Sequence, residues 1–233
     1  MEIRGLQKTS LIDYPGEICS TIFVGGCNLR CRYCFNKGLV LNAASMPIIS
    51  KLEVLNFLES RASLIEAVCI TGGEPTLQDG LLAFLKDLRQ LKLKIKLDTN
   101  GTRPEIVQEA LLKGLVDYIA MDIKCPFARY PEVTGANLQD ITKIEQTVSL
   151  LINSDFNYEF RTTVVPSLLD EEDIIEIAKT IAGCRKYYLQ QFRPNVDLLD
   201  PSLGKIPPFS QEKMVQLAAA CFPYLANVQL RGC

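Results

Sequence analysis

The sequence predicts an α/β fold, built as a partial (β/α)6-type barrel that is open on one side. Two observations predict it: short apolar and β-branched runs alternate with longer amphipathic segments, and polar motifs follow several of the strand-like runs. Such alternation implies parallel strands joined by right-handed crossovers. Because six or seven strand–helix units fall short of eight, a closed barrel is not expected.

The predicted elements follow one another in a regular order. The first half contains strand 17–24 (EICSTIFV), helix 50–63, strand 66–71 (EAVCIT), helix 79–91, strand 93–98 (LKIKLD), helix 104–114 and strand 117–122 (DYIAMD). The second half contains helix 139–153, strand 157–164 (NYEFRTTV), helix 170–182, strand 186–191 (KYYLQQ), helix 210–221 and strand 227–230 (NVQL). Helix-start signals at Pro104, Asp170 and Ser210 support three of the helices.

No composition break, low-complexity run or clear internal repeat divides the chain. We therefore expect residues 1–233 to form one domain, since α/β barrels often take roughly 200–250 residues as a single unit. The segments 35–48 and 193–209 are irregular and are candidate substrate-facing loops.

The composition excludes several classes of function. The chain has no histidine, which removes Ser-His-Asp triads, Cys-His proteases, His-ligated zinc and haem, and zinc deaminases. With 25 basic and 27 acidic residues the net charge is −2, so an extended nucleic acid is not an expected partner. No apolar stretch reaches the roughly 18 residues of a membrane span, and the start lacks the apolar core of a signal peptide. We expect a cytoplasmic protein without membrane contact.

The strongest chemical signal is a Cx3Cx2C run formed by Cys27, Cys31 and Cys34, directly after the first predicted strand. Three thiolates at this spacing can converge on one soft metal centre. Iron–sulfur clusters usually have four cysteine ligands, so a local set of three suggests an iron that is open to an exogenous ligand. Structural zinc completed by a distant cysteine such as Cys19, or chance clustering of buried thiols, are the alternatives.

This run, with an aromatic residue (Tyr33) before its last cysteine, resembles the signature of the radical S-adenosylmethionine (SAM) superfamily. The resemblance implies that Cys27, Cys31 and Cys34 hold a [4Fe–4S] cluster whose fourth iron is chelated by SAM. It also places Tyr33 against the adenine. Reductive cleavage of SAM would then give methionine and a 5′-deoxyadenosyl radical, which abstracts hydrogen from the substrate.

A second motif, TGGEP, ends the next predicted strand. Alone, paired glycines before a helix are more often a plain connection than a binding site. Beside the cysteine run, the motif resembles the GGE motif of the same superfamily. The resemblance implies that Gly72, Gly73 and Glu74 bind the amino group of SAM.

Two further strands end in DTNG and MDIK. Alone, DTNG could be an Asn-Gly turn and the charges of MDIK could simply be solvated. Both segments resemble the glycyl-radical-enzyme activating branch of the superfamily. This implies that Asp98, Thr99 and Asn100 serve the cofactor or an associated cation, and that Asp122 and Lys124 reach the SAM ribose or carboxylate.

Arg161 lies within a predicted strand between apolar residues, where an arginine is costly to bury unless it meets an anion. It could pair with an acid such as Asp122, but the resemblance implies a SAM contact. Gln191 ends the next strand and is a candidate for the adenine edge, with packing as the alternative. Cys125 and Cys233 are candidate reactive thiols of unknown role.

The segment 5–16 (GLQKTSLIDYPG) resembles the start of anaerobic ribonucleoside-triphosphate reductase activating proteins. This implies an activase that abstracts a Cα hydrogen from a glycine of a partner enzyme and leaves a glycyl radical. No further cysteine-rich insertion is present, so one cluster and an external one-electron reductant such as flavodoxin or ferredoxin are expected.

Two alternatives stay open. The first is a radical SAM enzyme acting on a small molecule, for example a 7-deazapurine of queuosine metabolism, as a queuine lyase or 7-carboxy-7-deazaguanine synthase would. The segment 193–209 would then close on the substrate, with Arg193 and Asp197 as polar contacts. The second is a noncatalytic iron–sulfur module for redox or sensing.

Overall fold

The computed structural model of the protein describes residues 1–233, which divide into two compact units. The first unit consists of residues 1–28, 38–99 and 103–120, and the second of residues 29–37, 100–102 and 121–233. The expected single domain stays a prediction.

The strands follow chain order in one sheet, and β1 and β8 are the two ends of that order. The sheet is therefore not closed into a barrel, and the predicted open α/β class is confirmed. The strands are β1 (Ile3–Ser10), β2 (Cys19–Val24), β3 (Ala67–Gly72), β4 (Lys94–Thr99), β5 (Tyr118–Asp122), β6 (Tyr158–Val164), β7 (Tyr187–Gln191) and β8 (Val228–Arg231).

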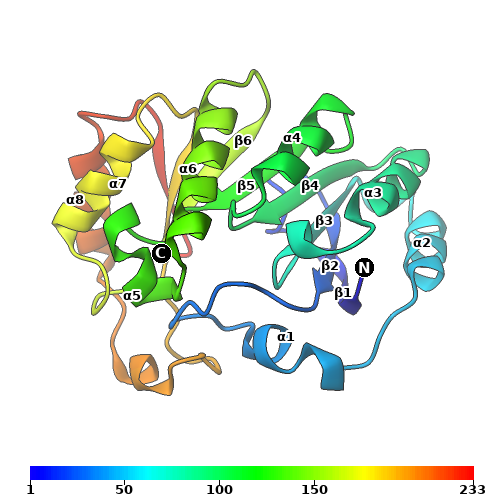
Figure 1. The fold of residues 1–233 in the computed structure, drawn as a ribbon, viewed down its shortest axis with the longest axis horizontal. Helices are drawn as coiled ribbons and strands as arrows, with labels where there is room; N and C mark the ends of the chain where they lie inside the picture. Colours follow the sequence, from blue (N-terminus) through cyan, green and yellow to red (C-terminus); the bar gives the residue numbers. More distant parts are fainter. The chain divides into compact units, whose positions relative to one another are not determined.

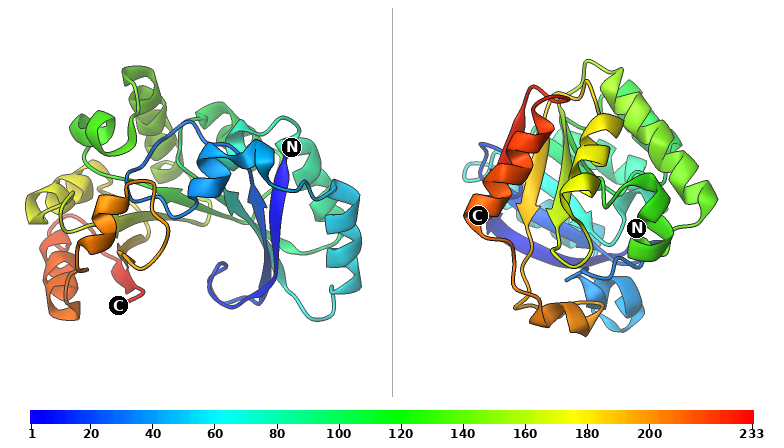
Figure 2. Two further views of the ribbon diagram at one scale, coloured as in Figure 1. Left: turned by 90° about the horizontal axis from the view of Figure 1, so that it is seen from below. Right: turned by 90° about the vertical axis from the view of Figure 1, so that its left-hand side faces the viewer.

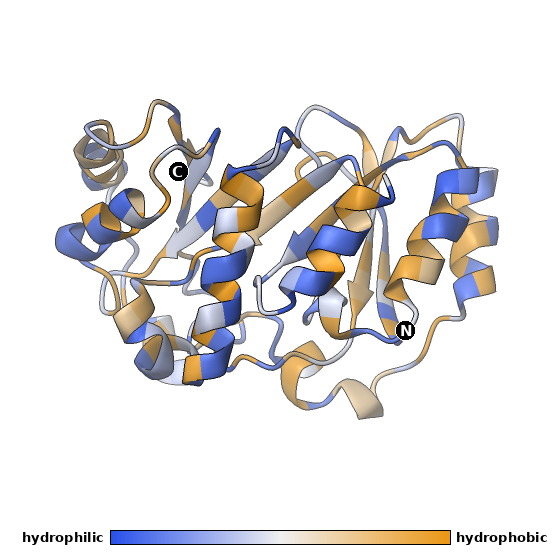
Figure 3. Cartoon of the chain, turned by 45° about the horizontal axis from the view of Figure 1, so that its top comes forward, coloured by the Kyte–Doolittle hydropathy of each residue, from blue (hydrophilic) through white to orange (hydrophobic).

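In the first unit, β2, β3 and β4 are parallel, and their apolar residues form a buried core. The helices of this unit are α2 (Lys51–Ser60), α3 (Leu81–Gln90) and α4 (Pro104–Leu112), and Figure 1 shows α2 and α3 as neighbours. In α3, Leu81, Leu85 and Leu88 recur at helical spacing and are fully or almost fully buried. Figure 3 shows the same division of helices into an apolar and a polar face.

Strand β1 was not predicted. It runs antiparallel to β2, from the pair Ile3 and Val24 to the pair Ser10 and Cys19, and lies beside it in Figure 2. Its residues do not alternate between buried and exposed, because register shifts interrupt the pairing at two places. The sequence IRGLQKTS likewise does not alternate between apolar and polar residues, so it gives no strand signal. The short helix α1 (Lys37–Leu41) lies within the predicted irregular segment 35–48 and was missed as well.

In the second unit, β6, β7 and β8 are parallel. Its helices are α5 (Tyr130–Thr134), which was not predicted, α6 (Leu138–Ile152), α7 (Glu171–Thr180) and α8 (Gln211–Cys221). The last two lie side by side (Figure 1; Figure 2). The predicted start of α7 is confirmed, because Asp170 and Asp173 form a capping box. Ser210 likewise caps α8, and Pro104 is in the first turn of α4.

None of the helices combines the length and the apolar character that a membrane crossing demands.

Candidate functional site

The three cysteines of the Cx3Cx2C run are divided between the two units. Cys27 follows β2 in the first unit, whereas Cys31 and Cys34 belong to the second. All nine cysteines of the chain are thiols rather than disulfides. Neither unit by itself holds three cysteine or carboxylate side chains arranged as a metal site.

The GGE motif is held against the loop that leads to the first cysteine. The Gly73 amide donates to the Val24 carbonyl at 2.8 Å, and the Glu74 amide donates to the Gly26 carbonyl at 2.8 Å. Gly72 has φ +114°, and a Cβ atom on Gly73 would lie 1.9 Å from the Gly26 oxygen. Both glycines are therefore required by backbone conformation and close approach.

Glu74 is 1% exposed, and threonines hold its carboxylate. Its Oε1 accepts bonds from the Thr76 amide (3.0 Å), the Thr76 hydroxyl (2.5 Å) and the Thr99 hydroxyl (2.8 Å). The structure thus brings together Glu74 and Thr99 from two predicted motifs. Thr76 was missed, although an acidic residue before Pro75 is a helix-start signal that could have indicated it.

Asp98 lies at the end of β4 and is paired with a buried lysine. Lys96 is 2% exposed, and its ammonium contacts the Asp98 carboxylate and, at 3.6 Å, the Cys69 sulfur. The Cys69 sulfur is 3.8 Å from Asp98 Oδ1. Lys96 was not predicted, although the two-residue period of KIKLD places it on the same face as Asp98.

Asn100 shapes its own loop in the second unit. Its Oδ1 accepts bonds from the Thr102 amide (3.0 Å) and hydroxyl (2.7 Å), while Thr147 donates to the Gly101 carbonyl at 2.6 Å. The side chain therefore fixes the turn after β4. Its role toward a cofactor stays a prediction.

The loop that carries Cys31 and Cys34 is anchored on both sides. On one side the amides of Arg30 and Arg32 donate to the carbonyls of Thr134 (2.7 Å) and Val133 (3.1 Å) in α5. These bonds fix the course of the main chain around the cysteines. Helix α5 thus has a structural role beside the predicted site.

On the other side, the segment predicted to face the substrate holds the same loop. The Leu199 amide donates to the Cys34 carbonyl at 2.9 Å, and the Asp200 amide donates to the Arg32 carbonyl at 2.8 Å. The guanidinium of Arg32 donates in turn to Asp200 Oδ2 at 2.8 and 3.0 Å. The Asp200 carboxylate also caps the following turn through the Ser202 amide at 3.0 Å. None of these contacts was predicted.

Replacing Asp200 by alanine is expected to loosen the cysteine loop, because it removes the Arg32 pair and the cap at Ser202. Iron should be lost to a chelator severalfold faster than from the wild type. Asp155 is the matched control, since it forms an exposed pair with Arg185 elsewhere in the same unit. Equal rates for Asp200→Ala, Asp155→Ala and wild type would show that the segment does not hold the loop.

Asp122, Lys124 and Arg161 form an ion triad. Arg161 Nε donates to Asp122 Oδ1 at 2.7 Å and Lys124 Nζ donates to Asp122 Oδ2 at 2.8 Å. Burial opposes ionisation of Asp122, but Arg161 and Lys124 hold its pKa well below the usual value. Burial opposes the charged form of Lys124 as well and so lowers its pKa. The charges of Asp122 and nearby Cys31 outweigh burial, and the net pKa of Lys124 is above its usual value. The triad therefore carries two positive charges and one negative charge.

Two buried polar atoms of this unit have no hydrogen-bond partner: the Tyr33 hydroxyl and Gln191 Oε1. The Gln191 amide nitrogen donates to the Phe209 carbonyl at 2.6 Å. Burial, followed by the charges of Cys31 and Asp122, raises the pKa of Tyr33 well above its usual value. Unpartnered buried polar atoms are rare. A bound ligand can satisfy such atoms, and the resemblance implies adenine at both residues.

Cys125 does not have the environment of a reactive thiol. It is fully buried, and burial together with the charge of Cys31 raises its pKa far above the usual value. Cys233 is exposed, and partial burial raises its pKa as well.

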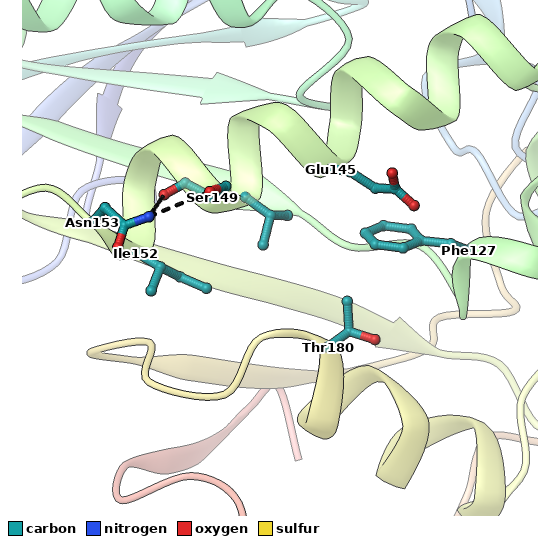
Figure 4. Close-up of a pocket in the computed structure, with 7 residues that line it drawn as sticks. Phe127, Glu145, Ser149, Ile152, Asn153 and Thr180 are labelled. Carbon is teal, nitrogen blue, oxygen red and sulfur yellow. Dashed lines mark hydrogen bonds between the residues drawn. The ribbon is translucent and has the colours of Figure 1, made fainter.

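A groove of about 300 Å³ lies on α6 and α7 (Figure 4). It contains none of the predicted site residues. Its wall is reinforced by Asn153, which donates to the Ser149 carbonyl at 2.9 Å. The lining residues are Phe127, Glu145, Val148, Ser149, Ile152, Asn153 and Thr180.

Comparison with known proteins identifies a family and several relatives. The family model described as "Radical SAM superfamily" matches residues 21–181. A protein of Methanocaldococcus jannaschii named "Putative glycyl-radical enzyme activating enzyme" is 35% identical, covering 98% of this chain and 95% of its own. The 7-carboxy-7-deazaguanine synthase of Hyperthermus butylicus is 25% identical, covering 80% of this chain and 86% of its own.

Among solved structures, SuiB of Streptococcus suis is similar, with a TM-score of 0.69 and 15% identity. The alignment covers 91% of this chain and 49% of SuiB, so the chain spans about half the length of that protein. The structure of SuiB bound to SAM gives a TM-score of 0.66. At this identity, the likeness shows a shared fold.

Proposed function

Because the chain belongs to the radical SAM superfamily, we propose that it installs a glycyl radical on a partner enzyme such as anaerobic ribonucleotide reductase. The protein is a radical SAM enzyme whose cofactors are a [4Fe–4S] cluster and SAM. When bound, these cofactors supply a 5′-deoxyadenosyl radical by one-electron cleavage of SAM. Membership of this enzyme superfamily argues against the alternative of a noncatalytic iron–sulfur module.

The observation that carries this proposal is the relationship to the M. jannaschii protein, which extends over nearly the full length of both chains. Its name refers to activation of a glycyl-radical enzyme. The resemblance of the segment 5–16 to activating proteins supports the same assignment independently of the cysteine motif.

In this proposal Cys27, Cys31 and Cys34 hold the cluster as thiolates. Three ligands leave one iron open, as the chelation of SAM requires. In the second unit, Lys124 lies close enough to Cys31 for the two charges to interact. A cation therefore lies near the Cys31 thiolate. Such a cation favours the deprotonated form of a neighbouring thiol.

The proposed SAM contacts in the second unit involve charge and unpartnered polar atoms. The ion triad has one positive charge in excess, which suits the SAM carboxylate. Tyr33 and Gln191 would take the adenine, whose polar edge can satisfy their unpartnered atoms. The remaining proposed contacts are Gly72, Gly73, Glu74, Asp98, Thr99 and Asn100.

Replacing Arg161 by alanine is expected to weaken SAM binding about tenfold to a hundredfold, because it removes one proposed charge-assisted hydrogen bond to SAM. It also removes the bond to Asp122. Iron content should stay at the wild-type level, because no cysteine is changed. Isothermal titration with SAM and an iron assay measure the two quantities. Arg185→Ala, which removes an exposed pair, is the matched control. An unchanged SAM affinity would leave Arg161 with the structural role of pairing Asp122.

The second candidate function is the synthesis of a 7-deazapurine. It is favoured by the 7-carboxy-7-deazaguanine synthase of H. butylicus, which aligns with most of this chain. Its identity is lower than that of the M. jannaschii protein, so we place it second.

One anaerobic assay separates the two candidates. The protein is reconstituted with iron and sulfide, reduced with dithionite and given SAM, and 5′-deoxyadenosine is measured with and without additives. Stimulation by a glycyl radical protein encoded in the same genome is expected. Stimulation by 7-deazapurines alone would select the second candidate.

The physiological electron donor and the compartment belong to the same proposal. An external one-electron reductant such as flavodoxin or ferredoxin is proposed, because the chain contains no further cysteine-rich segment for a second cluster. A cytoplasmic location is proposed because thiol ligands persist in a reducing compartment.

A further inference from the structure

In the second unit, Arg231 on β8 lies on the same face of the strands as Arg161 on β6. The pairing register places Arg161 beside Tyr188 and Gln190 beside Arg231. Tyr188 and Gln190 are two residues apart in β7, so they share a face. The alternate residue, Leu189, is fully buried on the opposite face. Arg231 therefore belongs to the face that carries the proposed SAM-binding arginine.

The guanidinium of Arg231 is held in one orientation. Its two terminal nitrogens donate to the two oxygens of Glu159, at 2.7 and 3.1 Å. Its central carbon lies 3.9 Å from the centroid of the Tyr188 ring. A bidentate carboxylate and a stacked aromatic ring together fix both the plane and the direction of the fork.

The two partners differ in exposure. The Glu159 side chain is 0% exposed, whereas the Arg231 side chain is 30% exposed. A guanidinium has five N–H donors, and Glu159 takes two of those of Arg231. The other three N–H groups of this partly exposed side chain are not used by Glu159, whose buried carboxylate supports the fork.

The charges favour a neutral acceptor over an anion. Glu159 compensates the charge of Arg231, so the pair is neutral as a whole. An anion is stabilised less by the charges beside Arg231 than by those of the triad of Asp122, Lys124 and Arg161. The triad has one positive charge in excess. Main-chain carbonyl oxygens are neutral, strong acceptors.

We propose that Arg231 is a substrate-binding residue, whose remaining N–H groups donate to main-chain carbonyl oxygens of the peptide segment that contains the target glycine. This inference rests on the proposed activase function and names a contact within it. Glu159 and Tyr188 are positioning residues, since they act by holding the fork.

The test compares Arg231→Gln with wild type in reconstituted, reduced protein. SAM cleavage without partner is measured alongside, and the control Arg185→Gln should leave it unchanged. The partner concentration for half-maximal glycyl radical formation should rise about tenfold or more, the cost of one hydrogen bond from a charged donor. Arg231→Lys should fall between the two, because an ammonium lacks the planar fork. A synthetic peptide spanning the radical glycine, used as a competitor, should inhibit the wild type more strongly than Arg231→Gln.

Arg231→Gln leaves Glu159 buried without its cation, so it is paired with a second variant, Glu159→Gln/Arg231→Gln, which has no buried charge at this place. Arg185→Gln is the control for loss of an exposed arginine. Wild-type partner dependence in the folded double variant would overturn the role of Arg231. Wild-type protein that cleaves SAM but activates no partner would overturn the proposed function, and the peptide contact with it.

Discussion

Replacing Cys31 by alanine is expected to reduce SAM cleavage to background. The variant should also retain little iron after anaerobic reconstitution, because two thiolates cannot hold a cluster that needs three. Cys31 is buried and lies within electrostatic reach of Lys124. Iron content and 5′-deoxyadenosine formation measure the result.

Two further variants make this experiment decisive. Cys31→Ser keeps the size of the side chain and should lose the cluster as well, which separates ligand loss from a packing defect. Cys184→Ala removes another buried thiol of the same unit, one that lies outside the motif, and should keep both iron and activity. Persistent 5′-deoxyadenosine production by the Cys31 variants would contradict the ligand assignment.

Replacing Gly73 by alanine is the second change with a large expected effect. The new Cβ would lie 1.9 Å from the Gly26 oxygen, so the loop before Cys27 must move. That movement breaks the bond between the Glu74 amide and the Gly26 carbonyl. We expect a loss of about 1–3 kcal/mol of unfolding free energy, the usual cost of overpacking. SAM binding should weaken more than tenfold, because main chain proposed to contact it is displaced.

Gly38→Ala is the matched control in the same unit. Gly38 lies in α1, has no positive φ, and a Cβ there would meet only the Met46 sulfur at 3.8 Å. Thermal unfolding and SAM titration of the two variants should therefore differ clearly. If Gly73→Ala keeps wild-type SAM affinity, the GGE motif is a backbone support and not part of the SAM site.

The sequence alone was sufficient for features that depend on local pattern. Parallel strands followed by helices produce a clear change of hydrophobic period, and the starts of helices are marked by capping side chains such as Asp170. Motif residues such as Gly72 and Asp122 are located at strand ends because the pattern fixes where a strand ends. Strand β1 was not found, because its sequence IRGLQKTS does not alternate between apolar and polar residues.

Features that depend on contacts between distant segments were not predictable. The ion pair between Arg32 and Asp200 joins residues 168 positions apart. The ion pair between Arg231 and Glu159 joins residues 72 positions apart. Neither has a local signal, because each partner alone looks like an ordinary surface charge. The buried pair of Lys96 and Asp98 was predictable in principle from its two-residue spacing.

The most direct test of the activase assignment is electron paramagnetic resonance of the partner after reaction. Reconstituted protein, reductant, SAM and the glycyl radical protein of the same genome are incubated anaerobically, and the partner is then separated and measured. A glycyl radical is expected on the partner, dependent on SAM and absent with Cys31→Ala. SAM cleavage without any radical on the partner would contradict it, and turnover of a 7-deazapurine in the same preparation would assign the enzyme to a small-molecule substrate.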